Sequence, residues 1–548
     1  MRMGRCRRVA AAASAGALSG VLLAAPASIG ASPEPVTLRA AVSRFSRVDP
    51  QLASSFAAWT TSYDTYIPLL TYRHAAGTAG SEVIPGLAMR MPMISDGGRT
   101  YTLFLRRGLR YSDGTPVRAS DFKFAIERMF KLNSGGSYDY TDIVGARAFR
   151  KTGRGRIKGI VCNDSSGRIA IHLVKPKPGL LDVLAFPYAA PVPRDTPMRN
   201  QTLSPPPATG PYMIARSKRG VGWMLVRNPA WESGNARLMP QLPSGHVDRI
   251  EFRVVPYRNA RVAEVASGRL DWTADAPARR YAHLEHRFGR TRFRIEPGLS
   301  TLYFWLDTAR PPFDDVRVRR AANYAVSRSA LKRIYRGQLI PSEQILPPGM
   351  PGYRKLDLYP YNLAKARRLV AEADPPDREV TIWTDGERLQ RRAAAYFRRE
   401  LEKIGLRAHL EVVRGFFNYI RRTASRSTPN LDTGWSNWYA DYPHPDDFFR
   451  PLLLGSSITR RYNENLARID VPALNSRIER LSRKPLGRGL ERRYAALDRS
   501  YMRLAPWVPY GSFAESTFVS RAIDLDRVVW NPTFGADLTS FRFREGPE

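Results

Sequence analysis

Between Gly434 and Pro445 the sequence gathers aromatic side chains around one carboxylate, Asp441, and adds two prolines. Proline fixes its own φ and biases the residue before it toward extended geometry, so this stretch should leave a strand and turn sharply. A carboxylate among flat rings can hold a cation or an ammonium group, and the rings supply contact area at little entropic cost. The alternative is a loop at the edge of a core, in which the aspartate only caps a turn. The binding interpretation predicts a site that contains Asp441, Trp438, Tyr439 and Trp435.

The rest of the sequence offers little for catalysis. It contains no Gly-x-Ser-x-Gly, no Walker loop and no His-Glu-x-x-His, and His283 and His286 have the wrong spacing for the usual helical zinc pair. Gly153-Arg154-Gly155 lacks the third glycine and the strand-loop-helix setting of a dinucleotide site. We therefore expect no enzyme, no catalytic residue, no bound metal and no cofactor.

The length of 548 residues suggests roughly three or four folding units. The net charge of +36 first suggests nucleic acid or an anionic surface as a partner. However, the excess is mostly arginine and is spread thinly, without long basic runs or zinc-finger spacing, so we expect no nucleic-acid partner. A surface protein that binds polyanions remains the alternative function, and steep weakening of binding with added salt would identify it.

The first residues resemble a secretory signal peptide, expected to span residues 1–27. Four arginines precede an uncharged run from Val9 to Gly30, and Ala25-Pro26-Ala27 offers a cleavage site. The run could also remain as an uncleaved anchor, and Arg7-Arg8 leaves a twin-arginine export route open. The expected location is the periplasm or the extracytoplasmic cell surface. Cleavage would leave Cys162 as a single thiol, so the mature chain could not form an internal disulfide.

The pattern of apolar residues predicts an α/β fold. Expected strands are 36–48, 100–106, 223–227, 249–255, 380–383 and 408–413. Expected helices are 120–130, 259–267, 362–373, 389–404 and one long helix over 316–335 that Gly337 ends.

Short motifs in a fixed order give the chain a specific likeness. It resembles the extracytoplasmic solute-binding proteins of ABC importers, family 5, the class that includes oligopeptide-, dipeptide- and nickel-binding proteins. The matching segments are Val48–Pro50, Leu109–Val117, Asp121-Phe122, Thr209–Tyr212, Arg227–Pro229, Pro312–Ala321, Ala364–Ala366, Trp438–Pro445 and Ala505–Pro509.

The resemblance implies a two-lobed periplasmic-binding-protein fold of type II, whose lobes are connected by hinges and close around a solute. Lobe I would comprise residues 36–65, 200–298 and 512–548, an inserted domain residues 66–199, and lobe II residues 299–511. Hinges are expected near 297–301 and 510–512. The implied function is capture of a peptide-like or other small solute for import, by a monomer that works with membrane permease subunits.

The resemblance also bears on individual residues. In peptide-binding relatives an aspartate in the position of Asp441 pairs with the α-amino group of the ligand. Trp435 stands where some peptide binders carry a basic residue that can meet the ligand's carboxylate, which leaves other solutes open. Phe416 and Phe417 lie where a further aromatic wall is expected.

Overall fold

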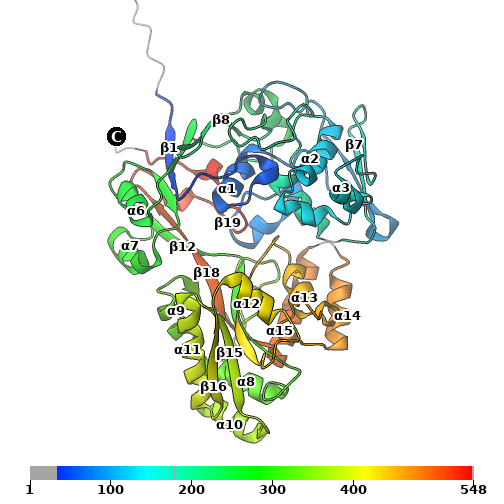
Figure 1. Cartoon of the computed structure of the whole chain (residues 1–548). Coiled ribbons are helices and arrows are strands. Elements are labelled where there is room, and N and C mark those ends of the chain that lie inside the picture. Colours follow the sequence, from blue (N-terminus) through cyan, green and yellow to red (C-terminus); the bar gives the residue numbers. More distant parts are fainter. Residues whose placement is uncertain (1–33, 178, 485, 546–548) are drawn as a thin grey trace, which may run out of the picture. The chain divides into compact units, whose positions relative to one another are not determined.

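The computed structural model describes residues 34–177, 179–484 and 486–545 (Figure 1). The predicted signal peptide, residues 1–27, lies outside the described residues. In the part of the chain that is described, no helix has the length and apolar character needed to cross a membrane.

The largest element is a mixed sheet, in which twelve strands of the described residues take part. The order along its main path is β16-β15-β17-β13-β18-β11-β1-β10-β9-β8, and β12 and β14 also pair with β18. The strands are β1 (Thr37–Val42), β8 (Tyr212–Lys218), β9 (Gly222–Arg227), β10 (Arg249–Val254), β11 (Trp272–Ala274), β12 (Phe293–Pro297), β13 (Ser300–Leu306), β14 (Leu339–Ile340), β15 (Glu379–Asp385), β16 (Arg407–Val413), β17 (Thr433–Tyr439) and β18 (Trp507–Val519). The α/β class expected from the sequence is confirmed, although β1 ends at Val42, six residues earlier than predicted.

Strand β18 belongs to both halves of this sheet (Figure 1). Its first residues pair with β13 and β14, and its later residues pair with β12 and β11. The change of partner falls at Phe513, whose carbonyl accepts from Gly298 N–H at 2.9 Å and whose N–H donates to Ser300 Oγ at 3.0 Å. The partner change of β18 at Phe513 and the short connection between β12 and β13 thus lie close to the hinges expected near 510–512 and 297–301. The boundaries of the lobes stay a prediction.

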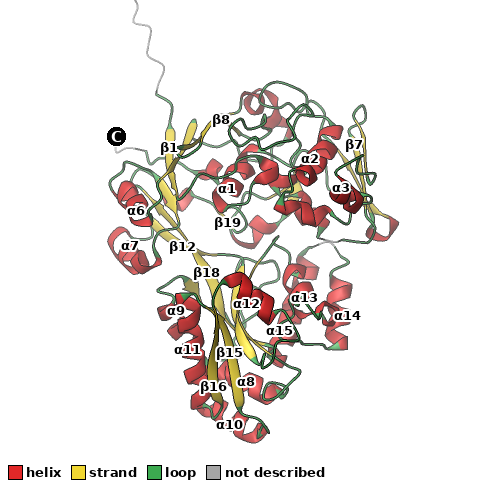
Figure 2. Cartoon of the chain, viewed as in Figure 1, coloured by secondary structure: helices red, strands yellow, loops and turns green. Residues whose placement is uncertain are grey.

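One half of the sheet carries a core whose buried residues all come from 299 to 510. Figure 2 shows helices beside its strands, and α11 packs against both β15 and β16. Helix α11 buries Ala393, Phe397 and Leu401 and turns its arginines outward, as expected of an amphipathic helix. The helices of this region are α8 (Val316–Ala325), α9 (Arg328–Ile334), α10 (Leu363–Ala373), α11 (Arg388–Lys403), α12 (Phe416–Thr423), α13 (Asp446–Leu453), α14 (Pro472–Leu481) and α15 (Arg488–Leu504).

The single long helix predicted over 316–335 is wrong, because the structure breaks it into α8 and α9. Ser327 lies at the break in an extended conformation and caps α9, with its Oγ accepting from Ala330 N–H at 3.3 Å. Ser327 N–H donates to the Tyr396 hydroxyl at 2.8 Å. This tertiary hydrogen bond replaces the backbone hydrogen bond that Ser327 N–H would make inside a continuous helix.

The segment 66–199 carries its own four-stranded sheet, in the order β4-β5-β7-β6. Its elements include β2 (Leu70–Tyr72), η2 (Gly77–Ser81), β3 (Val83–Pro85), β4 (Met93–Ser95), β5 (Thr100–Phe104), α2 (Ala119–Lys131), α3 (Ala146–Thr152), β6 (Ile160–Asn163), β7 (Arg168–His172) and α4 (Leu180–Leu184). The other half of the large sheet carries α1 (Phe56–Thr65), α6 (Arg258–Ala266) and α7 (Tyr281–Phe288).

A buried ion pair ties α2 to the turn at Asp49. Arg128 is fully buried and donates to both Asp49 carboxylate oxygens, at 2.8 and 2.7 Å. Its guanidinium also donates to Gln51 Oε1 and to the carbonyls of Pro197 and Arg199, so the charge is surrounded by acceptors. The Val48-Asp49-Pro50 motif therefore has a structural role here.

Replacement of Gly511 by alanine should destabilise the chain by about 1–3 kcal/mol, the usual effect of overpacking. An added Cβ would lie 2.5 Å from the Ile340 carbonyl oxygen and 2.7 Å from Leu339 Cδ1, so β14 and β18 would have to separate. Chemical denaturation measures the effect, with Gly489→Ala as the control because no neighbouring atom lies within 4 Å of its Cβ position. A Gly511→Ala chain as stable as the parent would contradict the close approach.

Candidate binding site

The predicted binding stretch begins as a strand and then turns. Its residues up to Tyr439 belong to β17, which pairs with β13 throughout and with β15 only at its start. Residues 440–445 form the turn, and α13 starts directly after Pro445. The sharp turn is therefore as expected, but Trp435 and Trp438 project from a strand and not from the loop.

A buried carboxylate holds the turn in place. Asp447, in the first turn of α13 and 5% exposed, accepts two hydrogen bonds at Oδ2. Trp438 Nε1 donates to this oxygen at 3.1 Å and Asp441 N–H donates at 2.9 Å. Burial and the nearby Asp441 carboxyl raise the pKa of Asp447 well above its usual range, against the effect of these two donors. The turn thus depends on the backbone of Asp441 and leaves its side chain available.

The Asp441 side chain is exposed, and no salt bridge among the described residues includes it. The surrounding protein removes part of its hydration and raises its pKa to about 6, and the carboxyls of Asp139 and Glu464 add to the shift. Lys177 opposes it, but that ammonium already lies against the carbonyl and carboxylate of Asp139. On a chain of net charge +36, this is a local excess of carboxylates. Such a group attracts a cation.

The aromatic side chains beside Asp441 differ in their exposure to solvent. Tyr439 is 46% exposed and stacks on Phe513, with ring centroids 5.6 Å apart. Trp438 is half-buried and packs at the edge of the core of residues 299–510. Both residues border the turn, and Tyr439 also contacts the strand that crosses between the two halves of the sheet.

The other predicted site residues are placed differently. Trp435 is 3% exposed and donates from Nε1 to the Tyr510 hydroxyl at 2.8 Å, so it is part of the core. Phe416 and Phe417 lie on α12, 47% and 86% exposed, and pack on each other. No described hydrogen bond or ring contact joins these two rings to Asp441. The structure therefore gathers Asp441, Trp438 and Tyr439, and the ligand roles of all six residues stay predictions.

Sequence reasoning missed the residues that surround Asp441. The position of Asp447 could have been predicted, because acidic residues favour the first turn of a helix and Pro445 marks the start of this one. Nothing in the sequence indicates that Asp139, Lys177 and Glu464 lie near Asp441, since each is far from it in the sequence or on another element. Only the tertiary fold brings them together.

Among the described residues, Asp64, His74 and Asp537 form a group whose ligand atoms lie close enough together to hold a metal ion. His74 Nδ1 lies 2.7 Å from Asp537 Oδ2 and 3.7 Å from Asp64 Oδ1, and Asp64 and Asp537 are essentially fully buried. Burial raises the pKa of Asp64 well above its usual range, whereas the pKa of Asp537 is lowered because His74 and Thr539 outweigh its burial. His74 and Asp537 form a buried hydrogen-bonded pair, whereas Asp64 Oδ1 and His74 Nε2 are buried without a hydrogen-bond partner among the described residues, so the expected absence of a metal stays a prediction.

Comparison with known proteins identifies the family. The sequence model described as "Bacterial extracellular solute-binding proteins, family 5 Middle" matches residues 82–459, which include β17 and the Asp441 turn. The chain belongs to this family. It is 26% identical over 481 residues to "Heme-binding protein A" of Haemophilus influenzae, covering 82% of each chain. It is 26% identical over 432 residues to "Dipeptide-binding protein" of Escherichia coli, covering 74% of this chain and 76% of the relative.

Solved structures show the same fold. "Clavulanic acid biosynthesis oligopeptide binding protein 2" is 26% identical with a TM-score of 0.77, over 93% of this chain and 95% of that one. The unliganded open form of the murein tripeptide binding protein MppA is 20% identical with a TM-score of 0.80, over 93% and 98%. The periplasmic-binding-protein fold expected from the sequence is thereby confirmed. As a family 5 member the chain is the solute-binding component of an ABC importer, and the polyanion-binding alternative is not favoured.

Proposed function

We propose that this family 5 protein captures a small solute that carries an ammonium or other cationic group and that Asp441 binds this group. The single observation that carries the proposal is the exposed Asp441 carboxylate, which forms no salt bridge among the described residues and lies among further carboxylates. Trp438 and Tyr439 supply the adjacent aromatic surface, which suits the apolar part of such a solute.

A peptide or peptide-like solute fits this proposal, because its terminal ammonium group matches Asp441. The names of relatives support the class, since they include dipeptide- and glutathione-binding proteins. The relatives also include a heme-binding protein, so the family does not fix the ligand. The relatives are binding proteins, and we propose a non-enzymatic role for this chain too.

We further propose that the chain is exported, as a periplasmic or extracytoplasmic monomer, and delivers its solute to ABC permease subunits. The description of the family as extracellular supports this location. A thermal-shift screen of the purified protein tests the ligand class, with di- and tripeptides, polyamines, sugars and metal chelates as candidates. Stabilisation by sugars alone would contradict a cationic solute.

Affinity for an amino-terminated solute should fall as the pH drops below about 6. The pKa of Asp441 is raised to about 6, so protons compete with the solute cation below this pH. An α-amino group has a pKa near 8 and stays protonated between pH 7 and 5, so the solute itself does not change. Isothermal titration calorimetry should show a loss of affinity of roughly fivefold between pH 6 and pH 5, because the ionised fraction of a carboxyl with a pKa of about 6 falls from about one half to about one eleventh. A flat profile would show that the Asp441 carboxylate does not bind the cation. The carboxyls of Asp139, Asp447 and Glu464 and the Lys177 ammonium face the same region and can broaden the transition.

A further inference from the structure

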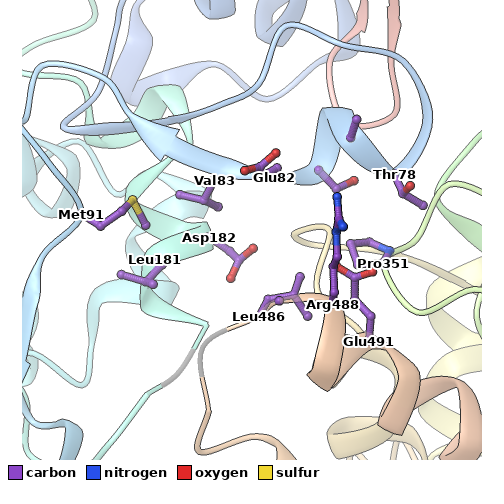
Figure 3. A pocket seen from close by; sticks show the side chains of 13 residues that line it. Thr78, Glu82, Val83, Met91, Leu181, Asp182, Pro351, Leu486, Arg488 and Glu491 are labelled. Atoms are coloured by element: carbon purple, nitrogen blue, oxygen red, sulfur yellow. The ribbon is translucent and has the colours of Figure 1, made fainter. Parts of the chain in front are cut away.

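One hollow of the structure has none of the six predicted residues in its lining. It has a volume of about 470 Å³, within the range of small-molecule pockets. Segment 66–199 forms one side, through η2, β3, Met91 and α4, and the other side comes from Pro351 and the start of α15. Figure 3 shows Met91 and Leu181 on one side of the pocket, Arg488 and Glu491 on the other, and Asp182 between them. Asp441 is not among its lining residues.

Asp182 is the unusual group in this pocket. It is 3% exposed, and its Oδ1 is buried without a hydrogen-bond partner among the described residues. The Tyr72 hydroxyl donates to the Asp182 backbone carbonyl at 3.0 Å. Burial raises the pKa of this carboxyl to about 7, and Asp446 adds to the shift. A buried polar atom without a partner is unfavourable for stability, so its presence at the wall of a pocket points to a ligand that satisfies it.

The remaining lining residues indicate the kind of ligand. Glu82 and Glu491 add two carboxylates, against one guanidinium from Arg488. Arg73 already pairs with Glu82 at 2.8 Å. Val83, Met91, Leu181 and Leu486 supply apolar surface between these charges. With Glu82 already paired, Glu491 and the buried, unsatisfied Asp182 remain against Arg488, and this balance favours a cationic group over an anionic one.

We propose that this pocket is a second binding subsite, which takes an aliphatic chain that ends in an ammonium or guanidinium group and seats that cation against Asp182. The methylenes of such a chain would lie along Leu181, Met91 and Leu486, and the donor hydrogens would satisfy the buried carboxylate. The side chain of a lysine or arginine residue has this chemistry, and so does an alkyl polyamine. The inference goes beyond the proposed function and does not depend on Asp441.

The test uses n-butylammonium chloride as the ligand and the full chain carrying Asp441→Asn, so that the Asp441 carboxylate cannot contribute. Ligand-observed NMR titration should show saturable binding of n-butylammonium and no comparable binding of n-butanol. Non-specific attraction of the cation is disfavoured by the net charge of +36. Absence of saturable binding, or equal binding of n-butanol, would overturn the proposal.

Variants then locate the bound cation. Asp182→Asn should weaken n-butylammonium binding by about tenfold or more, whereas Asp526→Asn, at an exposed position outside the pocket, should leave it unchanged. Arg488→Gln should strengthen binding, because it removes a like charge from the wall. If circular dichroism shows that Asp182→Asn does not fold, Glu491→Gln serves instead, with an expected loss of about twofold to fivefold. Undiminished binding in the folded variant would overturn the assignment.

The two proposals can be distinguished by experiment. If Asp441 does not bind the main solute, the expected results for n-butylammonium at Asp182 do not change.

Discussion

Replacement of Asp441 by asparagine should lower the affinity for the cognate cationic solute by about 2–4 kcal/mol, roughly 30- to 1,000-fold. Asparagine keeps the shape of the side chain and removes its charge, and an enclosed charge-assisted hydrogen bond depends on that charge. The solute identified in the thermal-shift screen would be titrated by calorimetry against parent and variant.

The stability of the Asp441→Asn chain should not fall. The turn is held by the Asp441 backbone N–H, which donates to Asp447, and this bond remains in the variant. Asp526→Asn, an exposed change elsewhere, is the matched control for both measurements. If Asp441→Asn binds as tightly as the parent and melts several degrees lower, Asp441 is a structural turn residue and the proposed anchor is wrong.

Replacement of Arg128 by methionine should destabilise the chain by about 3–5 kcal/mol, the usual result of breaking a buried ion pair from one side. The variant leaves the Asp49 carboxylate fully buried with only backbone donors, Gln51 N–H and Gln201 N–H. Urea denaturation measures the loss.

Two further variants make the Arg128 experiment specific. Adding Asp49→Asn to Arg128→Met should recover part of the stability, because it removes the unpaired charge. Arg147→Met removes an exposed pair with Asp142, in which Arg147 is 71% exposed, and should change stability by no more than about 0.5 kcal/mol. An equal, small effect at Arg128 and Arg147 would show that the buried pair contributes no more than a surface pair.

Local patterns in the sequence predicted much of the fold because they reflect local physics. The strand predicted over 100–106 is β5, and the helices predicted over 362–373 and 389–404 agree with α10 and α11 to within one residue at each end. The cap at Asn362 and the left-handed backbone at Gly405 act within a few residues, so local sequence can predict such ends. The break at Ser327 was missed because apolar spacing continues across it, while the hydrogen bond that stabilises it comes from Tyr396, far along the chain. A tertiary contact overrode a local preference.

The candidate site was harder to predict for the same reason. The sequence identified the carboxylate of Asp441 but could not say which of the neighbouring rings face solvent. The burial of Trp435 depends on the elements that pack around β17 and on the hydroxyl of Tyr510. The pocket at Asp182 had no sequence signal, because its two sides come from segments far apart in the sequence, one between residues 78 and 182 and the other between residues 351 and 491.

The position of β18 in the chain has a consequence for the timing of folding. This strand lies between β13 and β11 in the large sheet, yet it is formed by residues 507–519, close to the C-terminal end. During synthesis neither half of the sheet can be completed until nearly the whole chain has left the ribosome. The large sheet can therefore close only at the end of synthesis, whereas segment 66–199, which has a sheet of its own, can form earlier.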